Sequence, residues 1–324
     1  MEPITTKAPA KIGIVIVWMG KLPSYFPLWM RSLVKNDGYD FYLFTDQPVE
    51  GAVPANLIVV RMSFPEIRTL IARKLSLEVN IPFAYKFCDF KPAYGEIFSD
   101  YLKKYDFWGC CDIDMLFGDL SKFITPALLA NHKKLFSRGH LMLFKNEPAV
   151  NAAYRSSNII DYRKALESPA YCFFDEWHGV HLIFEELGIG QYNKDVMGDI
   201  KVLSARLVCT NIRNYTPQIF AWEQGEVKQY HIEAGQLTFT ELAYIHFQKR
   251  KIALPDSAVY TSNTIILNPR ALLPFQDPIT TAVVKEYDRA DYNHYIGSQV
   301  KRIRKRLTSF NKQTQSFNKT ALHP

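Results

Sequence analysis

The segment from Asp106 to Leu120 constrains the fold more than any other stretch, because it places two carboxylates between two apolar runs. A carboxylate is rarely buried without a partner, since its desolvation is costly. Asp112 and Asp114 are two residues apart. On the end of an extended strand they would therefore point to the same side, because successive side chains alternate.

Two like charges on one side of a strand repel each other unless a cation lies between them. A divalent ion that binds carboxylate oxygens and leaves room for phosphate oxygens is the simplest solution. For a bare Asp-X-Asp, a solvated turn with two capping aspartates is the common alternative. The apolar flanks of Asp112 and Asp114 favour a metal site for a nucleotide diphosphate.

The N-terminal part predicts an α/β fold with a mostly parallel sheet. Residues 11–18 form a continuous β-branched run that is typical of a buried parallel strand. A helix over 27–35 and strands over 40–46 and 58–62 follow. In such sheets ligands bind at the carboxyl ends of the strands. We therefore expect the loop after Trp18, Asp46 and the Asp112/Asp114 pair at one edge.

The rest of the chain alternates further helices and strands. Helical spacing predicts helices over 64–77, 93–104, 126–131 and 149–166, and apolar runs predict strands over 141–144 and up to His246. Residues 188–229 mix polar, aromatic, Gly and Pro residues and predict irregular loops that suit acceptor recognition. Residues 260–273 predict a short strand and a loop.

Composition bounds the class of protein. The 324 residues are 48% hydrophobic and 14% aromatic, which indicates a globular chain with one large domain or two smaller ones. Five unevenly spaced cysteines argue against a disulfide framework and favour a reducing compartment. The N-terminus lacks the apolar core of a signal peptide, and no run is long enough to cross a bilayer. We therefore expect a cytoplasmic protein.

Three further groups of polar residues are candidates for binding or catalysis. Lys86, Asp89 and Lys91 alternate with aromatic residues, as on an amphipathic surface or in a loop that binds phosphate and sugar. Arg138 lies on a turn before the strand over 141–144. Asp175 and Glu176 are embedded in aromatic residues. Asp175 could cap a helix, or a carboxylate here could face a sugar, and both interpretations stay open.

A cationic cluster follows the late strand. A lone His246 could be an ordinary core histidine, but Lys249, Arg250 and Lys251 come directly after it. One imidazole and one lysine suit the completion of a metal site and the neutralisation of a diphosphate. Nucleic-acid binding is the competing use of such a cluster. The basic groups are too scattered to favour it.

The C-terminal tail has a different pattern. Apolar residues recur at helical spacing over 300–310, and the other face of this predicted helix is strongly basic. This pattern is typical of an interfacial helix on an anionic membrane, with a solvated helix or a disordered tail as alternatives. We expect a flexible N-terminus over 1–10, one catalytic domain over 11–275 and a basic tail over 276–324. The domain would divide at about residue 145 into a nucleotide-binding half and an acceptor-binding half.

Several blocks of the chain resemble nucleotide-sugar-dependent glycosyltransferases of the GT-A fold, in particular the bacterial family that builds capsular polysaccharide and lipopolysaccharide. The matching blocks are residues 85–92, 108–114, 118–120, 138–140, 175–176 and 245–250. The resemblance spans roughly residues 11 to 252. The Asp-X-Asp pair alone is weakly specific, whereas its combination with a late His-Phe-Gln-Lys-Arg is much more so.

The resemblance implies a GT-A-like, Rossmann-related sheet flanked by helices and a hexosyltransferase type of enzyme. It implies Mn²⁺ or Mg²⁺, a nucleotide-sugar donor that is most often a UDP-sugar, and a glycan or lipid-linked glycan acceptor. The implied metal ligands are Asp112, Asp114 and His246, and the implied catalytic residues are Asp175 and Glu176. The implied contacts to the donor are Asp46, Lys86, Asp89, Lys91, Asp112, Arg138 and Lys249.

A late histidine ligand is shared with retaining galactosyltransferases of the lipooligosaccharide type, so retention of anomeric configuration is slightly favoured. The Lys-Pro-Trp ending of their motif is missing here, which leaves stereochemistry and sugar identity open. We expect a peripheral protein on the inner face of the cytoplasmic membrane. Two other functions compete: a nucleotidyltransferase or phosphotransferase, which the missing Gly-rich phosphate loop disfavours, and a non-catalytic module that binds membrane surfaces.

Overall fold

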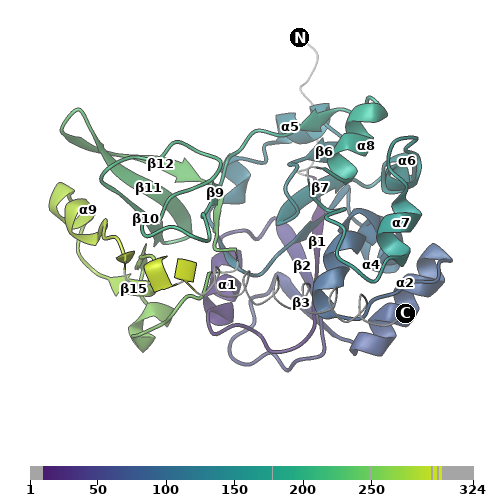
Figure 1. Ribbon diagram of the computed structural model, residues 1–324, viewed down its shortest axis with the longest axis horizontal. Helices are drawn as coiled ribbons and strands as arrows, with labels where there is room; N and C mark the ends of the chain where they lie inside the picture. Colours follow the sequence, from purple (N-terminus) through teal and green to yellow (C-terminus); the bar gives the residue numbers. More distant parts are fainter. Residues whose placement is uncertain (1–9, 177, 249, 293–294, 298, 301–324) are drawn as a thin grey trace, which may run out of the picture. The chain divides into compact units, whose positions relative to one another are not determined.

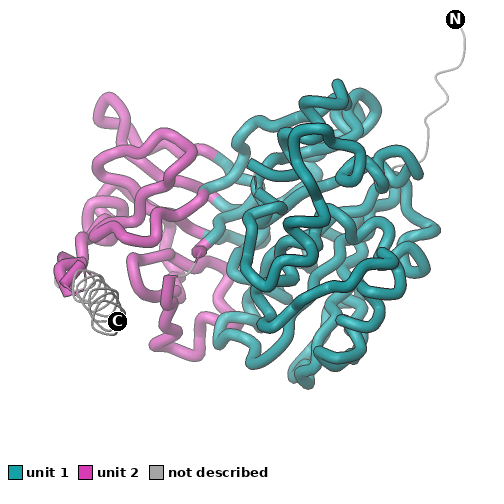
Figure 2. Tube along the Cα trace, turned by 45° about the vertical axis from the view of Figure 1, so that its right-hand side comes forward, with its two compact units in different colours: residues 1–198, 222–227, 241–246 teal, residues 199–221, 228–240, 247–324 magenta. Residues whose placement is uncertain are grey.

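A computed structural model describes residues 10–176, 178–248, 250–292, 295–297 and 299–300. The chain forms two compact units, which are coloured separately in Figure 2. Unit 1 comprises residues 1–198, 222–227 and 241–246. Unit 2 comprises residues 199–221, 228–240 and 247–324. These units are structural, so the predicted division into a nucleotide-binding and an acceptor-binding half stays a prediction.

A seven-stranded, mostly parallel sheet forms the centre of unit 1 (Figure 1). Its order is β3-β2-β1-β4-β7-β6-β8, and helices flank it, so the predicted α/β class is confirmed. The antiparallel pairs β4/β7 and β6/β7 interrupt the parallel pattern. The strands are β1 (Ile12–Trp18), β2 (Tyr39–Thr45), β3 (Leu57–Arg61), β4 (Phe107–Cys111), β6 (Lys134–Leu135), β7 (Leu141–Lys145) and β8 (Gln191–Tyr192).

The sheet is buried on both faces. Along β2, Tyr42 and Phe44 pack into one hydrophobic cluster, whereas Phe41 and Leu43 pack into another. This alternation follows from the two-residue period of a strand. It explains why the strands read as continuous apolar runs in the sequence. Parallel pairing of β1 with both β2 and β4 brings the carboxyl ends of the three strands to one edge.

Helices and short turns connect these strands. Helix α2 begins with a capping box, in which Ser63 and Glu66 bond each other's backbone amides. The elements up to β8 are α1 (Phe26–Leu33), α2 (Phe64–Leu75), η1 (Ala84–Ala93), α3 (Tyr94–Ile97), α4 (Ser99–Leu102), β5 (Met115–Phe117), η2 (Leu120–Lys122), α5 (Pro126–Asn131), α6 (Pro148–Asn151), η3 (Ala153–Arg155), α7 (Tyr162–Glu167) and α8 (Val180–Glu186).

Two smaller sheets complete the chain. One has the order β5-β13-β9, and the other has the order β12-β11-β10-β14-β15. The second sheet and α9 share a small core that includes Ile219, Ile266 and Val284. The remaining elements are β9 (Gly198–Asp199), β10 (Gln218–Glu223), β11 (Glu226–Glu233), β12 (Gln236–Leu242), β13 (Tyr244–His246), η4 (Ser257–Tyr260), β14 (Thr264–Leu267), β15 (Leu272–Phe275) and α9 (Thr281–Tyr287).

The prediction that residues 188–229 are irregular holds for residues 200–217, which contain no named helix or strand, but it is wrong for the last part, which contains β10 and the start of β11. The two strands are joined at Gln224 and Gly225, which both have positive φ. Tight hairpins require such backbone angles, but their usual sequence signal is Asn-Gly or Asp-Gly. Gln-Gly therefore gave no recognisable hairpin signal.

The single helix predicted over 149–166 is also wrong, because α6, η3 and α7 take its place. The hydroxyl of Ser157 accepts hydrogen bonds from the Ile159 and Ile160 amides. Such local side-chain bonds compete with helical ones and end the helix. The helix predicted over 93–104 is likewise divided into α3 and α4.

Three predictions fall wholly or largely outside the described residues: the flexible N-terminus, the position of Lys249, and all but the first residue of the basic helix over 300–310. Attachment to an anionic membrane and a place on its inner face therefore stay predictions. Among the described residues, none of the helices has the length and apolar character needed to span a membrane.

Asn36 connects α1 to the segment after β5, and its replacement tests how much this connection stabilises the fold. Its buried amide donates to the Gly118 carbonyl and accepts from the Leu120 amide, both at 2.9 Å. Asn36→Ala would leave both backbone groups without this partner. We therefore expect the free energy of unfolding in urea to fall by about 2–3 kcal/mol. The control, Asn131→Ala, removes an exposed amide and should change it by less than about 0.5 kcal/mol. Equal losses would contradict this account.

Candidate active site

A carboxylate oxygen of Asp112 and one of Asp114 lie within 4.8 Å of each other. The two aspartates follow β4, and β5 begins directly after them. Ile113 between them is fully buried, whereas Asp112 and Asp114 are only partly buried. The Asp112 amide donates to the His140 carbonyl at 3.1 Å, which fixes the end of β4 against the turn before β7. The carboxylates are thereby held at the edge where the parallel strands end.

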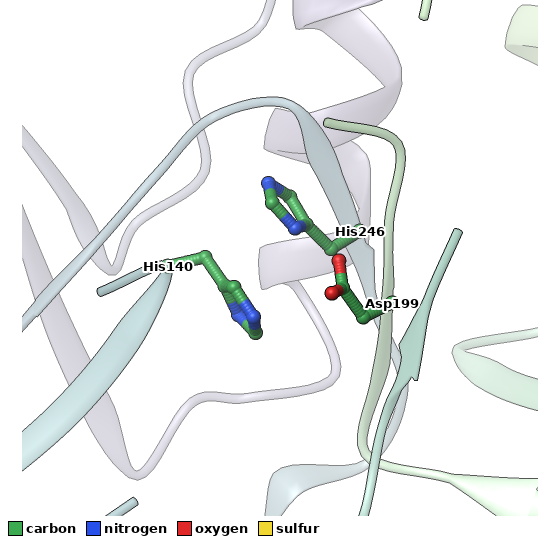
Figure 3. Close-up of side chains that lie close together, drawn as sticks. All are labelled: His140, Asp199 and His246. Atoms are coloured by element: carbon green, nitrogen blue, oxygen red, sulfur yellow. The ribbon is translucent and has the colours of Figure 1, made fainter. Parts of the chain in front are cut away.

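Strand pairing brings His246 to these aspartates. Strand β13 runs antiparallel to β5, with His246 opposite Met115. As a result, His246 Nε2 lies 3.3 Å from Asp114 Oδ1. The His246 ring also packs on the His140 ring, with centroids 4.3 Å apart (Figure 3). The Tyr244 hydroxyl lies 2.9 Å from His140 Nδ1, which helps to hold the rings in place.

Asp112, Asp114 and His246 form a donor set that fits a divalent cation. One ligand atom from each residue lies within 4.8 Å of the others. Two carboxylates and an imidazole suit Mn²⁺, and the carboxylates alone suit Mg²⁺. Asp199, also labelled in Figure 3, belongs to unit 2, where its carboxylate accepts hydrogen bonds from Thr210 and Gln248.

Lys91 links this donor set to a second acid. Its buried ammonium lies 2.7 Å from Asp112 Oδ1 and 3.2 Å from Asp175 Oδ2, and it donates to the Gly139 carbonyl at 2.8 Å. Burial alone would lower the pKa of Lys91, but chiefly Asp112, with Cys88 and Asp175, holds this pKa well above its usual range. The ammonium therefore stays charged and keeps the two carboxylates side by side.

Asp175 is an almost fully buried acid with a perturbed pKa. Burial is the main cause that raises this pKa to about 7; Lys91 opposes the rise, whereas the charges of Glu176 and Asp112 contribute to it. The Tyr171 hydroxyl donates to Asp175 Oδ1 at 2.9 Å. The alternative that Asp175 caps a helix is wrong, because the N-cap of α8 is Gly179.

Gly139 allows the close approach of Asp175. A Cβ atom at this position would lie 2.4 Å from Asp175 Oδ2. Because a contact this short is sterically forbidden, any side chain at residue 139 would displace the carboxylate or the turn. The turn Arg138-Gly139-His140 therefore makes room for Asp175, because Gly139 has no side chain. Arg138 itself makes a two-point contact with Asp195, at 3.0 and 3.2 Å.

Asp46 lies at the carboxyl end of β2, as predicted. Its Oδ1 accepts from the Gly20 amide and from Gln47 Nε2, both at 2.8 Å. Burial works against ionisation, but these hydrogen bonds lower the pKa of Asp46 overall. Gly20 has a φ of +89°, which favours glycine in this loop. Asp46 is thus an ionised group at the same sheet edge as Asp112.

The remaining residues that were predicted to contact the donor or to act in catalysis lie in different environments. Lys86 and Asp89 are fully buried and bond each other at 2.8 Å. They do not form the amphipathic surface that was one of the two sequence interpretations. Glu176 is partly buried, and its backbone amide bonds the Phe173 carbonyl. Lys249 lies outside the described residues.

Two tyrosines near the site were not predicted. Burial raises the pKa of Tyr25, and the charges of Asp114 and Asp112 raise it further, which places Tyr25 near the aspartate pair. Tyr171 bonds Asp175 as described above. The only sequence signal for a role in the site was their position: Tyr25 lies in the loop after β1, and Tyr171 lies shortly before Asp175. An isolated tyrosine in an aromatic-rich chain does not stand out from the core tyrosines.

Comparisons with known proteins give a family match and several similar solved structures. A model of a family of unknown function (DUF6625) matches residues 14–276. No curated protein matches the chain. The solved structures that are similar include the galactosyltransferase LgtC in complex with donor and acceptor sugar analogs, with 13% identity, a TM-score of 0.35 and coverage of 58% of this chain and 75% of that chain.

Two further solved structures are similar at the same level. The apo form of the glycosyltransferase GlyE from Streptococcus pneumoniae TIGR4 has 13% identity and a TM-score of 0.34, with coverage of 58% of this chain and 46% of that chain. The apo form of mouse xyloside xylosyltransferase 1 has 10% identity and a TM-score of 0.33, with coverage of 60% of this chain and 88% of that chain.

The donor set can be tested by metal binding alone. Asp114→Asn removes one anionic ligand, so we expect the Kd for Mn²⁺, measured by isothermal titration calorimetry, to rise by at least about tenfold. The matched control is Asp119→Asn, because Asp119 caps η2 and is not part of the donor set. An Asp114→Asn protein that binds Mn²⁺ as tightly as the Asp119→Asn protein would contradict the assignment.

Proposed function

The chain belongs to the family of unknown function DUF6625, and we propose that it is a metal-dependent glycosyltransferase. Its donor is a nucleotide-diphosphate sugar, with a UDP-sugar favoured by the resemblance of its motifs. Its acceptor is a glycan or lipid-linked glycan in the synthesis of a surface polysaccharide. One observation carries the proposal. The donor set of Asp112, Asp114 and His246 lies at the carboxyl ends of the parallel strands, and Lys91 connects Asp112 of this set to Asp175.

The charges of the site support a diphosphate donor. Asp112, Asp114 and His246 would hold Mn²⁺ or Mg²⁺. When bound, the cation would stabilise the negative charge that develops on the leaving nucleoside diphosphate. Asp46 at the end of β2 is an ionised acceptor that suits nucleoside hydroxyl groups, and Arg138 and Lys249 stay candidates for donor contact.

Asp175 is the favoured residue for the chemistry at the sugar. A carboxylate with a pKa near 7 is suited to take a proton from an acceptor hydroxyl in an inverting reaction. In a retaining reaction, which the late histidine slightly favours, the same ionised carboxylate would stabilise positive charge on the donor sugar. Lys91 keeps Asp175 beside the metal ligands in either case. Glu176 stays the second candidate.

A panel of nucleotide sugars with added Mn²⁺ tests the proposal. We expect at least one donor to bind and to be hydrolysed slowly without an acceptor, with release of the nucleoside diphosphate. Chelation by EDTA should stop the release, because the donor site needs the cation. Release of pyrophosphate or phosphate would favour a nucleotidyltransferase or phosphotransferase instead. Failure of every donor to bind with Mn²⁺ would contradict the proposal.

The pKa of Asp175 predicts a pH dependence. The ionised form is the active one, so kcat should rise between about pH 6 and pH 8, as the group loses its proton near pH 7. Asp175→Asn should remove this rise and lower kcat by roughly 10²-fold or more. Glu167→Gln is the control, because Glu167 is an exposed acid at the end of α7. An unchanged pH profile in the Asp175→Asn enzyme would exclude this role.

A further inference from the structure

The ion pair between Lys86 and Asp89 has no part in the site as described so far. Both side chains are fully buried, and Lys86 Nζ lies 2.8 Å from Asp89 Oδ2. Both residues lie on η1, which also carries Lys91. A buried ion pair is weak evidence for stability, because an apolar pair of similar volume often stabilises a protein equally well. Its other contacts indicate a different role.

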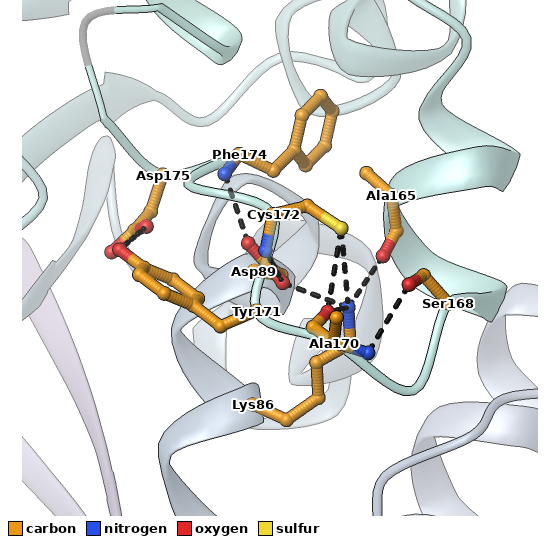
Figure 4. A network of polar contacts seen from close by, with 9 residues as sticks. All are labelled: Lys86, Asp89, Ala165, Ser168, Ala170, Tyr171, Cys172, Phe174 and Asp175. Atoms are coloured by element: carbon orange, nitrogen blue, oxygen red, sulfur yellow. Dashed lines mark hydrogen bonds and ion pairs between the residues drawn. The ribbon is translucent and has the colours of Figure 1, made fainter. Parts of the chain in front are cut away.

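The donors of Lys86 are directed at the segment that leads to Asp175. Its ammonium donates to the Ala165 carbonyl at 2.5 Å and to the Ala170 carbonyl at 2.7 Å (Figure 4). With the bond to Asp89, these contacts account for the three N–H groups of an ammonium. Lys86 therefore bonds the end of α7 and the loop after it, and no N–H group is left for a nucleotide.

The carboxylate of Asp89 holds the next residues of this loop. Its Oδ2 accepts from the Cys172 amide at 2.8 Å, and its Oδ1 accepts from the Phe174 amide at 2.9 Å (Figure 4). Phe173 between them has a φ of +60°, which is strained for a bulky residue. Strained backbone persists only where the surroundings impose it. The two amide bonds to one carboxylate impose this kink.

The same loop carries two groups of the candidate site. Tyr171 and Asp175 flank the held residues, and they bond each other at 2.9 Å. Asp175 then meets Lys91 at 3.2 Å. We propose that Lys86 and Asp89 form a clamp that fixes the loop over 170–175 and so positions Asp175 against Lys91. They are positioning residues, and their role in catalysis rests on the proposed function.

The double variant K86M/D89L tests the clamp. It removes both charges together and leaves no unpaired buried charge, so the fold should persist. The Cys172 and Phe174 amides lose their acceptor, and we expect hydrogen exchange of the peptide over 170–176 to become faster. We expect kcat for donor hydrolysis to fall on the order of 10²-fold, as for a displaced catalytic group. The Kd for Mn²⁺ and the KM for the donor should change less than about threefold, because the metal ligands stay in place.

Lys86→Met alone gives a graded comparison. It keeps the Asp89 carboxylate as acceptor for both amides, but this carboxylate is then buried without its counter-charge, which lowers the free energy of unfolding. In the folded protein, exchange over 170–176 should still be slower than in the double variant. The matched control is Lys134→Met. Lys134 is an equally buried lysine on β6 that donates to the Phe136 carbonyl and lies over the Phe144 ring. This control should keep wild-type kcat and wild-type exchange over 170–176.

The outcomes separate the clamp from the proposed function. A folded double variant with wild-type kcat, or with wild-type exchange over 170–176, would overturn the clamp. An equal fall of kcat in the Lys134→Met control would also overturn it, because loss of any buried lysine would then explain the effect. A wild-type protein that turns over no nucleotide sugar would refute the proposed function and the catalytic role of the clamp. The exchange measurement would still decide whether the clamp holds the loop.

Discussion

One buried ammonium holds the candidate site together. Lys91 is shared by Asp112 and Asp175, which come from the end of β4 and from the loop before α8. Without a cation between them, two carboxylates this close would repel each other and at least one would have to take up a proton. The lysine reduces that repulsion and also bonds the turn at Gly139. Three separate parts of the chain thus depend on a single side chain for their mutual arrangement.

The metal-binding set depends on a second long-range feature, the pairing of β13 with β5. Residues that are more than a hundred positions apart in the chain become neighbours because His246 pairs with Met115, directly after Asp114. His246 lies on β13 and the two aspartates lie between β4 and β5, so the backbone already holds the three ligands close together, which reduces the entropy cost of binding. The His140 ring packs against His246, and the Tyr244 hydroxyl bonds His140.

The sequence predicted the parts of this arrangement that depend on local patterns. The apolar runs of β1, β2 and β3 and the acids after β2 and β4 were recognisable because strand burial and strand ends leave a direct signal. The roles of Lys86 and Asp89 were not recognisable, because charged residues that alternate with aromatic ones give the same sequence pattern on a solvated face and around a buried ion pair. The contact of Lys91 with Asp175 depends on where a distant loop folds, and no local pattern encodes it. The β10–β11 hairpin was missed because Gln224 and Gly225 lack the usual turn signature.

Gly139 has a consequence for reading related sequences. Its carbonyl bonds the lysine, and its missing side chain leaves the space that the acid of the neighbouring loop fills. Even alanine would be too large there. In a family member with another residue at the aligned position, this acid or the turn would have to lie differently. This one column of an alignment would therefore separate relatives that can keep the arrangement of Gly139, Lys91 and Asp175 from those in which it differs.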